Sequence, residues 1–237
     1  MILAILTGLF LLLVFSPAVW TGVMRSLFPG LERVIYSMAP LGQLVLEHVF
    51  LVGISSGLAA VLGLATGIFV TRSWGRDFLP AVNALASMGQ TFPPVAVLAL
   101  AVPAVGFGYR PTIIALLIYG LLPIVRNTIA GIESLDGAVL EAARGMGMTP
   151  GQVLAKVELP LAGPVIMAGV RISTVINIGT ATLGATIGAG GLGKPIIAGL
   201  IGENPAFILE GAILVGLFAV IVDTGLGLLV RQDIAQA

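Results

Sequence analysis

The chain has 237 residues, of which 58% are hydrophobic and 9% charged, and its mean hydropathy is +1.12. Soluble proteins carry roughly a quarter charged residues, so this composition indicates an integral membrane protein. The formal net charge is zero, which leaves no excess of basic residues for nucleic acid or anionic lipid. With no cysteine and a single histidine, His48, the chain excludes disulfides, thiolate catalysis and histidine-rich metal sites.

Six apolar segments are long enough to cross a membrane as helices. About 20 apolar residues span the roughly 30 Å of hydrocarbon, and a helix satisfies its own backbone hydrogen bonds there. The segments are Ile2 to Val19, Val49 to Val70, Leu79 to Ala101, Thr112 to Ala130, Leu161 to Ile187 and Phe207 to Val230. We therefore predict an all-α, polytopic membrane helix bundle of about six spans, forming one transmembrane domain over residues 1–237. The first segment lacks a basic leader and a clear cleavage site, so we expect a retained span rather than a signal peptide.

Lysine and arginine predict which way the bundle faces. If the amino terminus is cytoplasmic, the inside receives Arg72, Arg76, Arg126, Arg144, Lys156 and Arg231, and the outside receives Arg25, Arg33, Arg110 and Lys194. This bias follows the positive-inside rule. It places both termini and the polar insert at residues 131–160 in the cytoplasm. Residues 31–47 are too polar and proline-interrupted to cross, so we expect them at the outer interface.

The second segment carries a stripe of small residues at helical spacing. Its members are Ser56, Ala60, Gly63 and Gly67. Small residues let helices approach closely in a membrane, where burial of apolar surface gives no drive. The stripe therefore predicts packing within the bundle, with a seam between two chains as the alternative.

Two motifs imitate enzyme sites. Residues 53–57 spell the G-x-S-x-G pattern of a serine nucleophile, but Ser55 and His48 would lie about 10.5 Å apart along one helix, far beyond the roughly 3 Å that proton transfer requires. Residues 188–194 resemble phosphate-binding loops, yet a membrane helix rather than a strand precedes them, and Pro195 replaces the hydroxyl residue. We expect packing glycines in the first case and irregular backbone in the second.

The insert at 131–160 has the signals of a helix, a sharp turn and a second helix. Asp136 is a predicted N-cap for a helix over residues 137–146, and Gly147 suits the left-handed position that ends it. Thr149 is a second cap, followed by a first-turn proline and by Gln152, which completes a capping box. We expect Leu159-Pro160 to start the fifth span afresh.

The same insert carries a recognisable spacing. Glu141-Ala142-Ala143 is followed after three residues by Gly147, and after nine more by Val157, one residue and Leu159-Pro160. This pattern resembles the signature of permease subunits of binding-protein-dependent ABC importers. Further similarity to the osmoprotectant branch, whose substrates include glycine betaine, choline and carnitine, lies in residues 47–49, 89–94, 156–161, 177–182 and 187–193. The resemblance covers a permease core at residues 45–230 and is greatest to the shorter permease of low-affinity betaine importers.

The resemblance implies the fold of a type I ABC importer permease (MetI-like) and a transport mechanism of alternating access in a bacterial cytoplasmic membrane. It implies two copies of an ABC ATPase, a periplasmic or lipid-anchored binding protein, and a second permease that is either another copy or a related longer chain. ATP and magnesium would be bound by the ATPase, so we expect no cofactor, metal or catalytic residue in this chain. We expect membrane lipid around the chain and no nucleic acid as a partner. The residues implied in coupling are Glu141, Ala142, Ala143, Arg144 and Gly147. Ala142 and Ala143 would provide a shallow docking face between the two charges.

Polar groups and prolines within the spans are candidates for the substrate pathway, because they are costly in lipid. They are Gln90, Thr91, Pro93 and Pro94 in the third span and Asn177, Thr180 and Thr182 in the fifth. Packing against backbone is the alternative for each. We expect Arg171 to pair structurally with Asp223, which reads as the one buried acid. Two alternative functions stay open: a permease for another small solute such as an amino acid, and an ion-coupled secondary transporter, which would show inverted repeats.

Overall fold

The computed structural model describes residues 1–236, with side chains for all of these except 89, 90 and 229–236. The helices are α1 (Ile2–Phe15), α2 (Pro17–Leu27), α3 (Leu41–Thr71), α4 (Leu79–Thr91), α5 (Pro94–Val105), α6 (Tyr109–Glu133), α7 (Gly137–Gly145), α8 (Pro150–Val153), α9 (Leu159–Ala181), α10 (Gly193–Ile201) and α11 (Pro205–Gln236). Short 3₁₀ turns at Arg76–Phe78 and Thr182–Ile187 and a π-helical turn at Leu154–Glu158 complete the elements. Residues 1–236 contain no strand, which confirms the all-α prediction.

Four helical stretches are long and apolar enough to cross a membrane. They are Leu41–Thr71, Tyr109–Glu133, Pro150–Ile187 and Pro205–Leu228. A fifth span results if α1 and α2 are counted as one bent helix. The predicted number of about six is therefore approximate, and the first and third predicted spans account for the difference.

The first predicted span is broken at Ser16. Helices α1 and α2 meet there at 86°, because a proline at 17 disfavours helical dihedrals in the residue before it and Ser16 has φ −119° and ψ 85°. The indole Nε1 of Trp20 donates to the carbonyl of Leu13 at 2.8 Å and secures the bend. The expected continuous helix to Val19 is therefore wrong, and α1 packs against α11 through Phe10 and Phe218, whose rings stack with centroids 6.1 Å apart.

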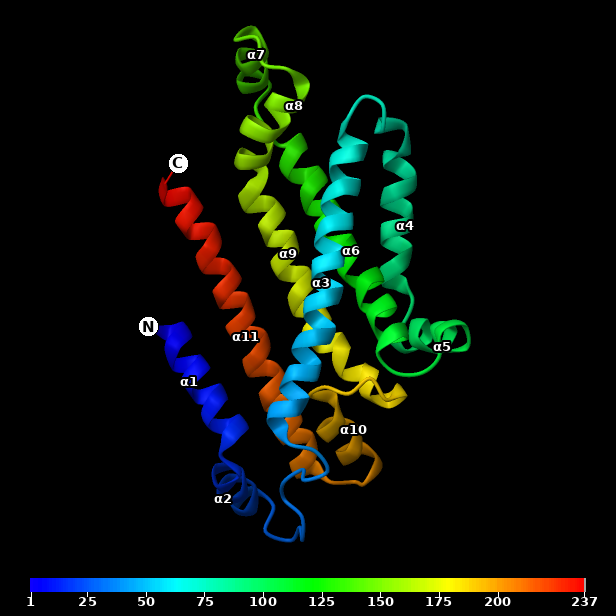
Figure 1. Ribbon diagram of the computed structural model, residues 1–237, viewed down its shortest axis with the longest axis vertical. Helices are drawn as coiled ribbons and strands as arrows, with labels where there is room; N and C mark the ends of the chain where they lie inside the picture. The colour runs from blue at the N-terminus through cyan, green and yellow to red at the C-terminus, as the bar shows by residue number, and fades with distance from the viewer. Residues whose placement is uncertain (237) are drawn as a thin grey trace.

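The third predicted span is also two helices. Phe92 and Pro93 are extended, with ψ of 132° and 137°, and α5 begins at Pro94 and lies across the direction of α4 (Figure 1). Consecutive prolines remove backbone donors and exclude helical dihedrals upstream. The hydroxyl of Tyr119 on α6 donates to the Phe92 carbonyl, so the break is tied to the bundle.

The bundle centre is formed by α3, α6 and α9, with α6 packed against both of the others. Gly63 and Gly67 allow the close approach of α3 to α6: a Cβ at Gly63 would lie 2.8 Å from Cγ2 of Ile124, and one at Gly67 would lie 2.5 Å from Cβ of Thr128. This part of the small-residue stripe packs inside the bundle, as predicted. A seam between two chains at these glycines is excluded, because α6 already occupies the face.

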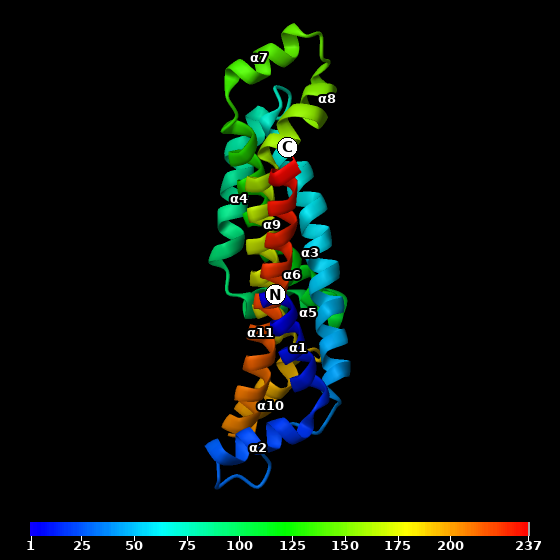
Figure 2. The same cartoon turned by 90° about the vertical axis from the view of Figure 1, so that its left-hand side faces the viewer.

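Short helices lie at the two opposite ends of the bundle. Helices α7 and α8 project at one end, whereas α2 and α10 lie at the other (Figures 1 and 2). Residues 28–40 link α2 to α3 without crossing, and the Asn204 amide donates to the Arg33 carbonyl at 2.8 Å. Helix α3 begins at Leu41, eight residues before the predicted start of that span, so residues 41–47 are helical rather than part of the interfacial segment.

The expectation of a single buried acid was wrong. Glu210 on α11 is 1% exposed and accepts a hydrogen bond from the backbone N–H of Tyr36 at 2.8 Å. Glu158 is 4% exposed. The side chain of Asp223, in contrast, is 41% exposed.

Candidate coupling surface and translocation site

The first helix of the insert, α7, is bounded as its sequence predicts. The Asp136 carboxylate accepts from the backbone N–H of Ala138 at 2.9 Å, which caps the helix start. At the other end the N–H of Met146 donates to the Ala142 carbonyl at 3.0 Å, and Gly147 follows with φ +83°. A side chain is strained in that left-handed region, whereas glycine is not. Both the cap and the glycine turn are confirmed.

The second helix of the insert also starts as predicted. Thr149 and Gln152 form a reciprocal capping box: the Gln152 N–H donates to the Thr149 hydroxyl at 3.4 Å, and the Thr149 N–H donates to the Gln152 side chain at 2.8 Å. Helix α9 begins at Leu159 with Pro160 in its first turn, as expected, but it continues from α8 rather than starting afresh. A π-helical turn at Leu154–Glu158 joins α8 to α9. Pro160 has no backbone N–H to donate, and the wider turn before it accommodates the missing hydrogen bond.

The exposed surface of the insert is narrower than predicted. Glu141, Ala142, Arg144 and Gly147 are exposed, but Ala143 is 2% exposed and packs within its own chain. The exposed part of the expected docking face therefore consists of Ala142 between two opposite charges, without Ala143. Figure 1 shows this helix projecting beyond the membrane-spanning bundle, where a second protein has access to it.

An ion pair connects the base of the insert to α3. The guanidinium of Arg72 lies 2.6 Å from the carboxylate of Glu158, with 21% and 5% of the two side chains exposed. Arg72 follows the last residue of α3, and Glu158 ends the π-helical turn. Two sequence segments that are far apart are thereby fixed to each other at the end that bears α7.

At the opposite end, the glycine-rich loop is held by a carboxylate rather than shaped to hold phosphate. A Glu47 oxygen accepts from the N–H of Gly191 at 2.8 Å and lies 3.3 Å from the Lys194 ammonium. Gly188, Gly190 and Gly191 have φ of 78°, 89° and 79°. A 3₁₀ turn and α9 precede the loop, so the irregular backbone predicted for it is confirmed.

The serine-histidine pair is part of the helix packing. Helix α3 is unbroken from Leu41 to Thr71, and both His48 and Ser55 are fully buried in it. The His48 Nε2 lies 3.1 Å from the Ile178 carbonyl on α9. The continuous helix keeps the two groups seven residues apart, so the exclusion of a nucleophilic site stands.

The seven pathway candidates lie in two places. Asn177 is fully buried and donates to the Ser56 hydroxyl at 3.0 Å, so it joins α9 to α3. Thr180 and Thr182 are half-buried. Thr91 and Pro93 are exposed at the α4–α5 break and Pro94 is half-buried there, while the side chain of Gln90 falls outside the described residues. Helix α5 contacts the 3₁₀ turn that follows α9, so the two groups lie on neighbouring elements rather than around one point.

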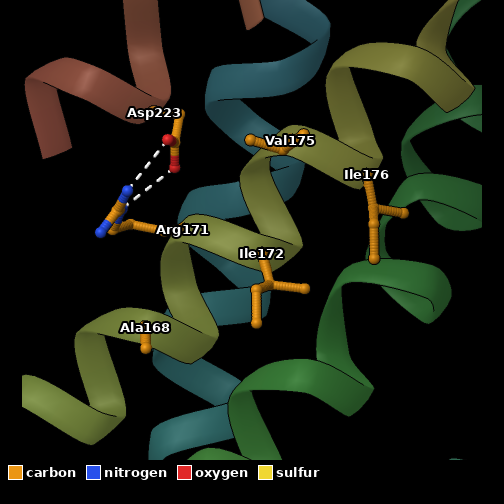
Figure 3. A pocket seen from close by; sticks show the side chains of 6 residues that line it. All are labelled: Ala168, Arg171, Ile172, Val175, Ile176 and Asp223. Atoms are coloured by element: carbon orange, nitrogen blue, oxygen red, sulfur yellow. Dashed lines mark hydrogen bonds and ion pairs between the residues drawn. The ribbon is translucent and has the colours of Figure 1, made fainter. Parts of the chain in front are cut away.

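Arg171 and Asp223 pair as expected. Nε and Nη2 of the arginine donate to the two carboxylate oxygens at 3.0 and 2.9 Å. The side chains are 34% and 41% exposed and border an open hollow of about 490 Å³ (Figure 3). Its other walls are Ala168, Ile172, Val175 and Ile176.

Comparison with known families identifies this architecture. The family described as "Binding-protein-dependent transport system inner membrane component" matches residues 59–232. The chain belongs to this family. The matched region includes the whole insert, the ion pair of Arg72 with Glu158 and the hollow at Arg171.

Individual permeases of this family are similar over most of their length. The osmoprotectant import permease OsmY of Salmonella typhimurium is 44% identical over 82% of this chain and 83% of its own. The choline transport permease OpuBB of Bacillus subtilis is 40% identical over 78% and 85%. The carnitine transport permease OpuCB of Listeria monocytogenes is 46% identical over 76% and 82%.

The permease also shares its fold with solved transporters. An inward-facing structure of the MetNI methionine ABC transporter matches with a TM-score of 0.72 at 25% identity, covering 81% of this chain and 95% of that one. The MetI-like fold implied by the sequence resemblance is thereby confirmed.

Sequence reasoning missed three contacts of this permease. They are the ion pair of Arg72 with Glu158, the hydrogen bond from the Gly191 N–H to Glu47, and the hydrogen bond from the Tyr36 N–H to the buried Glu210. Glu47 and the glycine loop were each visible as motifs, but their spacing of 144 residues gives no signal of contact. Glu158 lies inside the permease signature, where its charge could have prompted a search for a basic partner.

Proposed function

We propose that this permease is the membrane subunit of an ATP-driven importer for small quaternary ammonium osmoprotectants, of the class of trimethylglycine, carnitine and choline. The observation that carries the proposal is the exposed α7 helix with its Gly147 turn and capped α8, built on the spacing of the importer signature. The relatives named for osmoprotectant, choline and carnitine transport support the substrate class at 40–46% identity.

The mechanism is alternating access driven from the cytoplasmic end. Two ATPase subunits, which bind ATP and magnesium, dock on the α7 surface formed by Glu141, Ala142, Arg144 and Gly147. Closure of the ATPase dimer moves α7, and the continuous helix from α8 through the π-helical turn carries that movement into α9. The Arg72–Glu158 ion pair carries it into α3. This chain supplies no catalytic group of its own.

Substrate arrives at the outer end from a periplasmic or lipid-anchored binding protein. The proposed pathway includes Thr180 and Thr182, which follow the fully buried Asn177 in the sequence. It also includes the residues around the α4–α5 break, which are Gln90, Thr91, Pro93 and Pro94. A break in a membrane helix is tolerated where the backbone lines a cavity or is buried in protein. Asn177, already bonded to Ser56, serves the pathway by positioning α9 rather than by contact with solute.

A second permease completes the pathway. Two osmoprotectant import permeases of Salmonella typhimurium, OsmY and OsmW, are 44% and 38% identical to this chain, which supports a related partner over a second copy. Both termini are cytoplasmic in this proposal, and the protein resides in a bacterial inner membrane. The end of α11 points toward the α7 end of the bundle, in agreement with a cytoplasmic carboxyl terminus (Figure 1).

Uptake into proteoliposomes tests the proposal. The permease pair is reconstituted with its ATPase and binding protein, and labelled trimethylglycine is followed with ATP or a non-hydrolysable analogue inside. We expect uptake with ATP and none with the analogue. Uptake that persists without the ATPase and follows an ion gradient would establish a secondary transporter instead, and uptake of an amino acid in place of trimethylammonium compounds would reassign the substrate.

A further inference from the structure

The ion pair of Arg171 with Asp223 lies where lipid is an unfavourable neighbour. Arg171 is twelve residues into α9 and ten from its end, or about 18 Å and about 15 Å along the helix axis. Both charged side chains are more than one-third exposed at this depth. Ionisable groups inside a membrane face the bundle interior or a water-filled cavity, so this face of α9 borders an aqueous path.

The pair has unused bonding capacity. Its two hydrogen bonds engage Nε and Nη2 of Arg171, and in the part of the chain with described side chains Nη1 has no hydrogen-bond partner. Gly227 leaves room for the guanidinium, since a Cβ there would lie 3.2 Å from Cζ of Arg171. The arginine is thus held against α11 on one side, with donors left for another group.

The hollow beside the pair has the size and walls for a small solute. Its volume is about 490 Å³, within the roughly 300–1,000 Å³ of small-molecule sites. Ile172 and Val175 are exposed toward it. These apolar walls suit methyl groups, while the two charges beside them are of opposite sign, as are those of a betaine.

We propose that Arg171 and Asp223 form a transit site for small zwitterions, binding the carboxylate through the guanidinium and the quaternary ammonium through the carboxylate. The inference rests on the proposed function and adds its substrate-contacting residues. A quaternary ammonium has no N–H to donate, so Asp223 attracts it by charge alone. The absence of aromatic residues among the described lining of the hollow keeps this attraction weak, as a site that must release its solute requires.

Saturation-transfer NMR tests the site. The sample is the complex of this permease, its partner permease and the ATPase in nanodiscs, without the binding protein, so that the selectivity of the binding protein does not affect the result. Trimethylglycine and choline are the probes, because choline lacks the carboxylate. Arg171→Gln should weaken the binding of trimethylglycine, read from the transfer signal, about tenfold, the loss expected for one charge-assisted hydrogen bond, and should affect choline less. Asp223→Asn should weaken transfer to both probes.

Two control variants separate the site from general damage. Arg110→Gln makes the same chemical change at an exposed residue in the first turn of α6 and should leave both signals unchanged. Ile172→Trp fills the hollow without removing a charge and should reduce both signals, whereas Val61→Trp, on an exposed face of α3, should not. No transfer in the wild-type complex, or an equal loss of both probes in Arg171→Gln, would overturn the site, since an equal loss is what a purely structural pair gives.

Uptake by the complete importer distinguishes failure of the site from failure of the proposed function. If the wild-type importer takes up no trimethylammonium compound, the proposed function is wrong. If it takes up trimethylglycine, and Arg171→Gln and Asp223→Asn do so equally well, only the transit site is wrong. The result expected is uptake by the wild type and by Arg110→Gln, with reduced uptake by both site variants.

Discussion

Arg72 and Glu158 form an ion pair with 2.6 Å between the guanidinium and the carboxylate. The pair joins the end of α3 to the π-helical turn that leads from α8 into α9. A movement applied to the α7 surface therefore reaches two central helices of the bundle together. Because Glu158 is 4% exposed, its charge depends on Arg72 for compensation.

Loss of one partner of this pair should destabilise the permease. Arg72→Met leaves the Glu158 carboxylate buried without a counter-charge, which costs about 3 kcal/mol for buried pairs. Arg72→Met combined with Glu158→Met removes both charges and should recover most of that loss. Unfolding in mixed micelles with increasing dodecyl sulfate measures the free energy of unfolding of each variant. Single effects that simply add in the double variant would contradict the coupling.

Gly147→Asp should abolish assembly with the ATPase while the permease stays in the membrane. Gly147 has φ +83° and no atom within 4 Å of a Cβ built there, so the effect comes from backbone strain of roughly 1 kcal/mol or more and from displacement of the α7 surface. Gly151→Asp introduces the same side chain into the first turn of α8, where a Cβ also meets nothing, and serves as the control. Co-purification with tagged ATPase is the measurement. Normal recovery of the Gly147 variant would rule out this role for the turn.

Gly67→Ala should destabilise the contact of α3 with α6. The added Cβ would lie 2.5 Å from Cβ of Thr128, and overpacking of this kind costs about 1–3 kcal/mol. Gly57→Ala on the same helix meets no atom within 4 Å and should leave stability unchanged or raise it by up to about 1 kcal/mol, the difference in helix propensity. Thermal unfolding in detergent compares the two. Equal midpoints would show that the helices separate without cost at this point.

Glu47→Ala should loosen the glycine-rich loop. The Gly191 N–H loses its acceptor and Lys194 loses its counter-charge, so amide exchange over residues 188–194 should speed up. Lys194→Met removes only the ion pair and should change exchange less, because the backbone hydrogen bond stays. Hydrogen exchange read by mass spectrometry makes the comparison. Faster exchange in the lysine variant than in the glutamate variant would assign the loop's order to the ion pair instead.

Local chemistry in the insert was predictable from sequence. A cap residue, a glycine at a left-handed position and a capping box act over three or four residues, so Asp136, Gly147 and Thr149 could each be assigned before any tertiary contact was known. The pairing of Arg171 with Asp223 was also accessible, because two opposite charges in apolar spans have few other partners.

The helix breaks and the distant contacts were less accessible. Hydropathy measures how apolar a segment is, and the segments around Ser16 and Phe92 are apolar on both sides of their bends. The prolines at 17, 93 and 94 carried the missing signal. The partners of Glu210 and Glu47 lie 174 and 144 residues away, and no pattern within a helix points across such a distance. Burial of Ala143 likewise depends on how α7 folds back, which its sequence does not specify.

The carboxylate of Glu47 also restrains movement at the end of the bundle opposite α7. It fastens the first turns of α3 to the loop that leads into α10, and the His48 ring beside it meets the Ile178 carbonyl of α9. Because these contacts link the start of α3, the glycine-rich loop and α9, we expect the three segments to move together. We therefore expect α4 and α5 to move relative to the rest of the bundle at this end, with their link at Phe92 and Pro93 as the pivot. The distance between a spin label on α5 and one on α10 should accordingly change during the transport cycle. The distance between a label at the start of α3 and the same label on α10 should stay constant.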